Sequence, residues 1–226
     1  MTGLQDTIND YWTERAPSYD DYQRRPERRD LDVAAWSQIW STALPSAPAA
    51  VLDVGTGSGH VAFLLAGLGH DVTGIDLADG MLERAREHAS GLERAPRFEV
   101  GDAVSPPFPS QSFDAVVGRY VMWTLRDPAE AARHWLDLLR PGGTVAMVDS
   151  TWFPDGIGDL YDGPETDLPL AESTSIDDSA AVLASAGFAE VAVTPLESIY
   201  ALDEQHGVAP GHHVQMQYLV TGRRER

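Results

Sequence analysis

The chain has 226 residues and a formal net charge of −19, with 35 acidic against 16 basic residues and no cysteine. This length suits one domain with a sizeable core, and the acidic balance disfavours nucleic acid as a partner because it repels phosphate backbones. The lack of cysteine excludes disulfides and thiolate chemistry. No apolar run approaches the roughly 20 residues of a membrane span and no signal peptide is evident, so we expect a cytoplasmic protein with no membrane partner.

The first 48 residues have helical patterns and no convincing strand. We expect two helices, over 7–16 and 29–44, which together cover the main body. The second helix carries Trp36 and Trp40 one turn apart, a spacing that favours packing on one face. The basic run RRPERR at 24–29 lies between the helices and is interpreted as a solvated loop.

Strands and helices alternate between residues 50 and 149. Such alternation implies right-handed crossovers and predicts a doubly wound, Rossmann-like α/β sheet that is mostly parallel. Asp79 is expected to cap one helix, and Asp127 another, the latter with a proline and a capping-box glutamate behind it. The expected strands are 50–54, 71–76, 97–102, 113–118 and 144–149; the expected helices are 58–68, 79–89 and one that begins after Asp127.

The last third of the chain departs from this alternation. Residues 151–174 lack periodicity and are rich in glycine, proline and aspartate, which indicates a long loop serving as a lid over an acceptor. A helix over 175–186 is expected to end at Gly187. Two strands joined by DEQHGVAPG should then complete a seven-stranded sheet with a reversed last hairpin. We predict a single domain, 1–226, with 1–48 as its helical N-terminal cap.

The most informative segment is VLDVGTGSG at residues 51–59, where an apolar strand meets a glycine-rich turn and a helix. Glycines allow a tight turn and the close approach of a ligand. His60 stands where the third glycine of the dinucleotide motif G-x-G-x-x-G would fall. Asp76 ends the next strand, where a carboxylate can accept both ribose hydroxyls of an adenosine cofactor. The turn and Asp76 alone do not separate NAD from S-adenosylmethionine.

Five segments, VLDVGTGSG, TGIDLADGMLERA, FEVGDA, FDAVVGRY and LLRPGG, occur in this order along the chain. With them the chain closely resembles the class I S-adenosylmethionine-dependent methyltransferases, in the group that includes the quinone-biosynthesis enzymes. The resemblance covers residues 8–222. It implies S-adenosylmethionine as cofactor, S-adenosylhomocysteine as product, and methyl transfer to an oxygen, nitrogen or carbon atom of a small molecule.

The resemblance also implies which residues contact each part of the cofactor. The methionine end would contact Gly55, Thr56, Gly57, Gly59 and the Arg119 backbone, and Asp53 would hold its ammonium. Asp76 would bind the ribose, and Leu77 and Met81 would pack on the adenine. Asp102 and Ala103 would lie at the adenine amino group, and Tyr19 would close over the cofactor.

Methyl transfer from a sulfonium is a displacement that needs alignment and exclusion of water more than covalent catalysis. A general base is needed only for an acceptor that is protonated at working pH, so the catalytic residue stays unassigned. The acceptor pocket is expected where the N-terminal helices, the segment after the fourth strand, 151–174 and the final hairpin loop converge. Its candidate lining residues and bases are Tyr11, Tyr120, Trp123, Trp152, His206, His212 and His213.

Several alternatives stay open at this point. An NAD-dependent oxidoreductase or a noncatalytic S-adenosylmethionine-binding protein would share the glycine turn. The acidity could reflect solubility, salt adaptation or attraction of a cationic substrate, and the chain could be a monomer or a homodimer. No metal site is expected, because no HxH or HExxH pattern occurs and the adjacent His212 and His213 would point to opposite faces of an extended segment.

Overall fold

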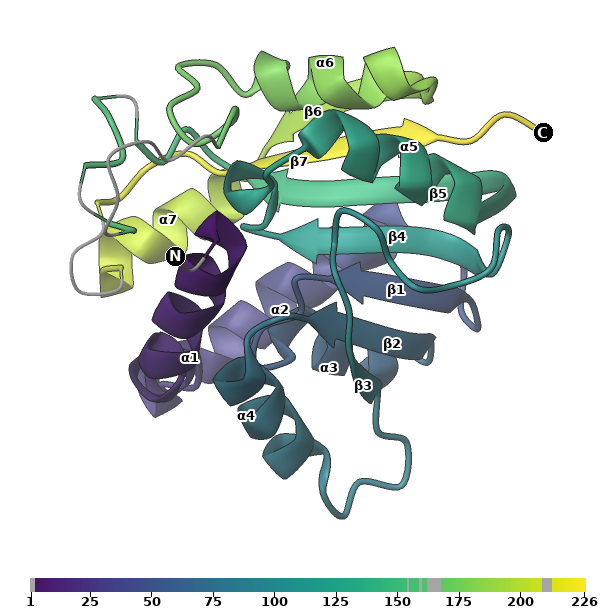
Figure 1. Cartoon of the computed structure of the whole chain (residues 1–226). Helices are drawn as coiled ribbons and strands as arrows, with labels where there is room; N and C mark the ends of the chain where they lie inside the picture. Colours follow the sequence, from purple (N-terminus) through teal and green to yellow (C-terminus); the bar gives the residue numbers. More distant parts are fainter. Residues whose placement is uncertain (1–2, 154, 159, 162–167, 209–212) are drawn as a thin grey trace.

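A computed structural model describes residues 3–153, 155–158, 160–161, 168–208 and 213–226. Its seven-stranded sheet has the strand order β3-β2-β1-β4-β5-β7-β6 (Figure 1). The strands are β1 Ala50–Val54, β2 Asp71–Asp76, β3 Arg97–Val100, β4 Phe113–Arg119, β5 Leu139–Asp149, β6 Ala189–Pro195 and β7 Tyr218–Arg223. Strand β7 is antiparallel to both neighbours, so β6 runs parallel to β5 and only β7 is reversed. The predicted doubly wound sheet is confirmed, with one reversed strand.

Helices flank both faces of the sheet and cross one end of it. They are α1 Leu4–Gln23, α2 Pro26–Ala43, α3 His60–Gly67, α4 Asp79–Ala89, α5 Pro128–Leu138, α6 Asp177–Ala186 and α7 Glu197–His206, with a short 3-10 helix η1 at Met122–Thr124. Figure 1 shows α5 and α6 in front of the sheet, with α2 and α3 behind it. Helix α1 lies beside the carboxyl ends of β1 and β4, the edge where ligands bind in such sheets. Among the described residues, no helix is both long and apolar enough to cross a membrane.

Alternate residues of the central strands belong to two separate cores. On β4, Val116 packs with the cluster under α5 and α6, whereas Val117 packs with the cluster under α2 and α3. The same division separates Val145 from Ala146 on β5. Side chains alternate between faces along a strand, so a sheet covered on both faces needs continuous apolar runs. This requirement explains the continuous apolar runs at 115–117 in β4 and 145–148 in β5.

The C-terminal hairpin differs from its prediction. The strand expected to lead directly into DEQHGVAPG stops at Pro195, and residues 197–206 form α7 instead of a strand and loop. Leu196, Ile199 and Asp203 are buried at helical spacing, a period that was missed when this segment was interpreted as a strand.

The prediction for Asp79 is also wrong in detail: Ala78 is the N-cap of α4, and no side chain caps it. Asp127 caps α5 as expected, accepting from Glu130 N.

The basic run at 24–29 is not the solvated loop that was predicted. Pro26 begins α2, and Arg28 is only 5% exposed. The Arg28 guanidinium lies 2.8 Å from Asp32 Oδ1 and 2.6 Å from Asp203 Oδ1, and it also donates to the Gly207 carbonyl at 3.2 Å. Burial raises the pKa of Asp203, so the carboxylate depends on this guanidinium for its charge. Arg28 therefore joins α2 to α7.

We expect Arg28→Met to destabilise the protein by about 3 kcal/mol, since it leaves Asp203 buried without its cation. Urea unfolding of the variant beside Arg29→Met measures this. Arg29 is exposed on the same helix, and its substitution should change stability by less than about 0.5 kcal/mol. Equal losses in the two variants would show that the buried ion pair is not what joins the helices.

Candidate functional site

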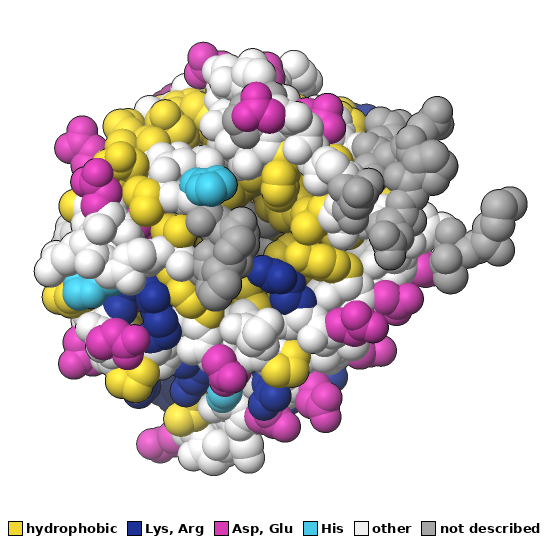
Figure 2. Space-filling view, turned by 90° about the vertical axis from the view of Figure 1, so that its left-hand side faces the viewer, with side chains coloured by type: hydrophobic (Ala, Val, Ile, Leu, Met, Phe, Trp, Pro, Cys, Tyr) yellow, Lys and Arg dark blue, Asp and Glu magenta, His cyan; other side chains and the backbone are white. Residues whose placement is uncertain are grey.

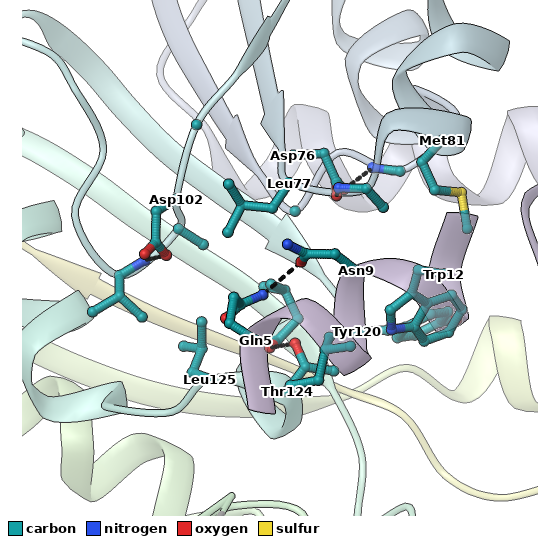
Figure 3. Close-up of a pocket in the computed structure, with 18 of the residues that line it drawn as sticks. Gln5, Asn9, Trp12, Asp76, Leu77, Met81, Asp102, Tyr120, Thr124 and Leu125 are labelled. Carbon is teal, nitrogen blue, oxygen red and sulfur yellow. Dashed lines mark hydrogen bonds between the residues drawn. The ribbon is translucent and has the colours of Figure 1, made fainter. Parts of the chain in front are cut away.

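A cavity lies between α1 and the carboxyl ends of β1, β2, β3 and β4. Figure 3 shows side chains of α1 facing the segments that follow the strands. Its lining comes from five stretches of chain, namely α1 (Gln5, Ile8, Asn9, Trp12, Tyr19), the glycine turn (Gly55, Gly57), the β2–α4 junction (Asp76, Leu77, Ala78, Met81), the segment after β3 (Gly101, Asp102, Ala103, Val104) and that from the end of β4 (Arg119, Tyr120, Val121, Thr124, Leu125). Most of the residues predicted from the resemblance thus meet in one place.

The three glycines of the turn have different physical roles. All have positive φ, but a Cβ on Gly55 would lie 2.5 Å from Val121, and one on Gly59 would lie 2.8 Å from Phe63 and Phe98. A Cβ on Gly57 would meet only Met81 Sδ, at 3.8 Å, and would extend into the cavity. Gly55 and Gly59 are therefore required by packing, and Gly57 leaves room for a ligand. Gly59 and Thr56 do not line the cavity.

Asp76 connects the glycine turn to the start of α4. Its Oδ2 accepts from Gly57 N at 2.8 Å and its Oδ1 accepts from Ala78 N at 2.9 Å. Burial raises the pKa of Asp76, and these two backbone donors oppose the shift. Each carboxylate oxygen has a further lone pair, so the group can still accept hydrogen bonds from hydroxyls in the cavity.

Asp53 lies beneath the turn rather than in the cavity wall. It is 1% exposed, and its Oδ2 accepts from Thr56 Oγ1 at 2.6 Å. Its Oδ1 has no hydrogen-bond partner among the described residues. Burial raises the pKa of Asp53 to about 7, which leaves a carboxyl poised to ionise beside a cation.

On the β3 side, Asp102 and Ala103 are fixed by neighbouring groups. Asp102 Oδ1 accepts from Val104 N at 2.9 Å, and Oδ2 lies 2.6 Å from Arg126 Nη2. The Ala103 carbonyl accepts from Trp135 Nε1 at 2.8 Å. These bonds fix the position of the loop after β3, which forms one wall of the cavity.

Four residues of α1 that sequence reasoning missed also line this cavity, the apolar Ile8 and, on one face, Gln5, Asn9 and Trp12. Gln5 Nε2 donates to Asn9 Oδ1 at 2.7 Å (Figure 3). Spacings of four and three residues put them on one helical face, and that spacing was a signal the sequence contained. Two amides on the apolar side of a helix supply both donors and acceptors to whatever fills the cavity.

A second cavity adjoins the first across Tyr19, Arg119 and Tyr120, which line both. Trp152 and His213, two of the candidates for the acceptor pocket, are on its wall. The Tyr120 and Trp152 rings meet edge to face, with centroids 4.9 Å apart. Asp149 at the end of β5 accepts from Trp152 Nε1 and so orients that ring. Asp149 was not predicted, although its position at a strand end was visible.

The remaining acceptor candidates lie elsewhere. Trp123 is 6% exposed and stacks on Tyr161, and Tyr11 packs edge to face on Tyr161 and Trp12. Neither is among the residues that line the two cavities, and their role as pocket residues stays a prediction. His206 ends α7 outside both linings. His212, and parts of the predicted lid at 151–174, lie outside the described residues. No group of three metal-ligating side chains occurs in the described part of the chain.

The described ends of the 151–174 segment are packed. Phe153, Leu168 and Ala171 belong to the same cluster as Ile8 and Trp123, and this cluster joins the segment to α1. Trp12 Nε1 donates to the Tyr161 hydroxyl at 3.1 Å. The stretch therefore supports the helix that covers the first cavity; its action as a lid stays a prediction.

Comparison with known proteins identifies the domain. Residues 52–147 match the family model described as a methyltransferase domain. The chain is 41% identical over 104 residues to the aklanonic acid methyltransferase DauC of Streptomyces sp. strain C5, covering 43% of this chain and 46% of that protein. It is 32% identical over 155 residues to the demethylmenaquinone methyltransferase of Thermus thermophilus, covering 64% of this chain and 66% of that protein.

The chain covers between 20% and 66% of the length of such curated relatives. Among solved structures, the YcgJ protein of Bacillus subtilis superposes with a TM-score of 0.63 at 21% identity, over 85% of this chain and 99% of that one. The likeness extends the fold beyond the matched segment to nearly the whole chain. The chain therefore carries a methyltransferase domain at residues 52–147, within the fold of the S-adenosylmethionine-dependent methyltransferases.

Proposed function

We propose that this chain transfers a methyl group from S-adenosylmethionine to a small-molecule acceptor. The observation that carries the proposal is the first cavity, which Gly57, Asp76 and Asp102 line at the strand ends of a methyltransferase domain. The proposal treats 1–226 as one functional domain, with residues 1–48 as the cover. No observation favours the oxidoreductase alternative.

The residues present fit the cofactor. A Cβ at Gly57 would fill the space that its methionine part needs, and the unpartnered Oδ1 of Asp53 is suited to a nearby ammonium. Asp76 would accept from the ribose hydroxyls and Asp102 from the adenine amino group, with Leu77 and Met81 against the ring. When bound, the sulfonium supplies an activated methyl group for displacement.

The chain's own residues would orient the reactants and exclude water. Helix α1 covers the first cavity, while Tyr19, Arg119 and Tyr120 separate it from the second, which we assign to the acceptor. Burial raises the pKa of Tyr120, so its hydroxyl stays protonated and does not act as a base. The similar methyltransferases are named for aklanonic acid, demethylmenaquinone and phosphoethanolamine, which supports a small acceptor rather than a nucleic acid.

A screen with methyl-labelled S-adenosylmethionine tests the proposal. Incubation with a small-molecule library should give a labelled product heavier by one methylene group, together with S-adenosylhomocysteine. Isothermal titration should first show S-adenosylhomocysteine binding to the protein. Binding without any turnover across the library would favour the noncatalytic binding protein, and absence of binding would reject the proposal.

Gly57→Ala should abolish the thermal stabilisation that S-adenosylhomocysteine gives to the protein. Gly91→Ala is the matched control. Gly91 also has a positive φ (82°, compared with 56° for Gly57), but a Cβ added at Gly91 would have no atom within 4 Å. Both variants should lose about 1–2 kcal/mol of stability to backbone strain. Only Gly57→Ala should lose the ligand-dependent shift in Tm; a normal shift in that variant would contradict the cradle.

The affinity for S-adenosylhomocysteine should fall as pH is lowered from 8 to 6. The raised pKa of Asp53, about 7, means that its carboxyl is increasingly protonated below pH 7, whereas a nearby ammonium favours the ionised form. Binding at low pH must therefore release this proton, at a cost of up to about tenfold in affinity per pH unit. Calorimetry on Asp53→Asn should give weaker binding with a flatter pH profile; an unchanged slope would remove Asp53 from the account.

A further inference from the structure

The second cavity carries positive charge in a strongly negative protein. Its lining includes three arginines, Arg25, Arg28 and Arg119, against two aspartates, Asp32 and Asp203. The whole chain has 35 acidic and 16 basic residues. Figure 2 shows this face with Lys/Arg side chains beside hydrophobic surface near its centre, while many of the acidic side chains lie toward its edge. The local charge is thus opposite in sign to that of the chain.

The two aspartates of this wall share one guanidinium as their partner, and the three arginines of the wall outweigh its two aspartates by a single positive charge. Arg28 pairs with Asp32 and with Asp203 at once. Within the described part of the chain, neither Arg25 nor Arg119 has a carboxylate at ion-pair distance. Arg25 donates to neutral acceptors, the Tyr22 hydroxyl at 2.9 Å and the His206 carbonyl at 3.4 Å. The cavity therefore has an excess of positive charge for a ligand to balance.

Within the described residues, Arg119 is held by contacts with aromatic rings and has no side-chain hydrogen bond. Its guanidinium carbon lies 5.1 Å from the Trp36 ring centroid and 4.5 Å from that of Tyr120. Contact with ring faces restrains a guanidinium through its flat sides and leaves its edge N–H groups available. A carboxylate fits such an edge with two parallel hydrogen bonds. Arg119 thus resembles a preorganised anion receptor between the two cavities.

The hydroxyl of Tyr120 has a fixed hydrogen-bond direction. Gln217 Nε2 donates to Asp203 Oδ2 at 2.8 Å, so Gln217 presents its oxygen to Tyr120 and accepts from the phenol. The Tyr120 proton is thereby engaged, and the oxygen can only accept from a ligand. A hydroxyl or N–H group on a ligand would satisfy it.

On the basis of the proposed function, we propose that the second cavity takes an anionic aromatic acceptor whose carboxylate binds the guanidinium of Arg119. The aromatic body would pack on Tyr120 and Trp152, and a ring hydroxyl would donate to Tyr120. A preference of this cavity for an anion is the opposite of the hypothesis that the acidic surface attracts a cationic substrate. The methionine end of the cofactor is a second source of a carboxylate, and the test below separates the two.

Binding of 4-hydroxybenzoate and its neutral counterpart 4-hydroxybenzamide, measured by calorimetry with S-adenosylhomocysteine at saturation, tests the preference. The acid should bind at least about tenfold more tightly than the amide, as expected for hydrogen bonds to a charged group. Arg119→Gln should abolish this preference, and Arg119→Lys should retain part of it because the charge remains. Arg133→Gln, an exposed α5 arginine remote from both linings, should keep it in full.

An acid that binds no tighter than the amide, or not at all, would overturn the inference while leaving the proposed function in place. The source of the carboxylate is tested with 5′-methylthioadenosine, which lacks the amino-acid part of the cofactor. If Arg119→Gln weakens S-adenosylhomocysteine relative to 5′-methylthioadenosine and spares the acid probe, the anion belongs to the cofactor and the inference is wrong. If wild type binds no S-adenosylhomocysteine, it is the proposed function that fails.

Discussion

The carboxylate and backbone of Asp76 join the three pieces of chain on which the first cavity depends. The side chain accepts from Gly57 N in the glycine turn and from Ala78 N before α4, while the Asp76 carbonyl accepts from Gly101 N after β3. Three crossover segments are thus tied to the end of one strand. Because β1, β2 and β3 are neighbours in the sheet, their carboxyl ends present these segments side by side. Three of the five stretches that line the cavity thus share this anchor.

The N-terminal helices turn that open edge into enclosed space. Helix α1 packs on α4 and on the cluster around Trp123, and contributes Gln5, Asn9 and Trp12 to the lining. The buried Arg28 pairs then tie α2 to α7, and the same Asp203 that receives Arg28 also positions Gln217 and, through it, Tyr120. A single polar chain therefore connects the stability of the helical cover to the orientation of a residue between the two cavities.

Much of the fold was predictable because its signals are local. The central strands β1, β4 and β5 contain apolar runs set by burial on both faces, and Asp127 with Pro128 marks a helix start. The errors arose where tertiary contacts decide the outcome. Arg28 is buried only because Asp203, far along the chain, is its partner, and α7 forms where a helical period competes with residues of good strand propensity.

The candidate site, like the fold, was predictable only where its signals are local in the sequence. The glycines and Asp76 follow from a spacing within one strand–turn–helix unit, so sequence reasoning reached them. It did not separate Gly57, which faces the cavity, from Gly59, whose neighbours are Phe63 and Phe98, because that distinction depends on side chains from other elements. Likewise Trp123 and Trp152 are equivalent as residues near strand ends, and only packing assigns one to a core and the other to a cavity wall.

The central claim is that the cavity anchored by Asp76 binds the adenosine part of S-adenosylmethionine. Isothermal titration of S-adenosylhomocysteine into Asp76→Asn tests it most directly, with Asp79→Asn, three residues on at the exposed start of α4, as control. The account predicts that wild type and Asp79→Asn bind alike, and that folded Asp76→Asn binds at least about tenfold more weakly. Equal affinity in all three proteins would contradict the account.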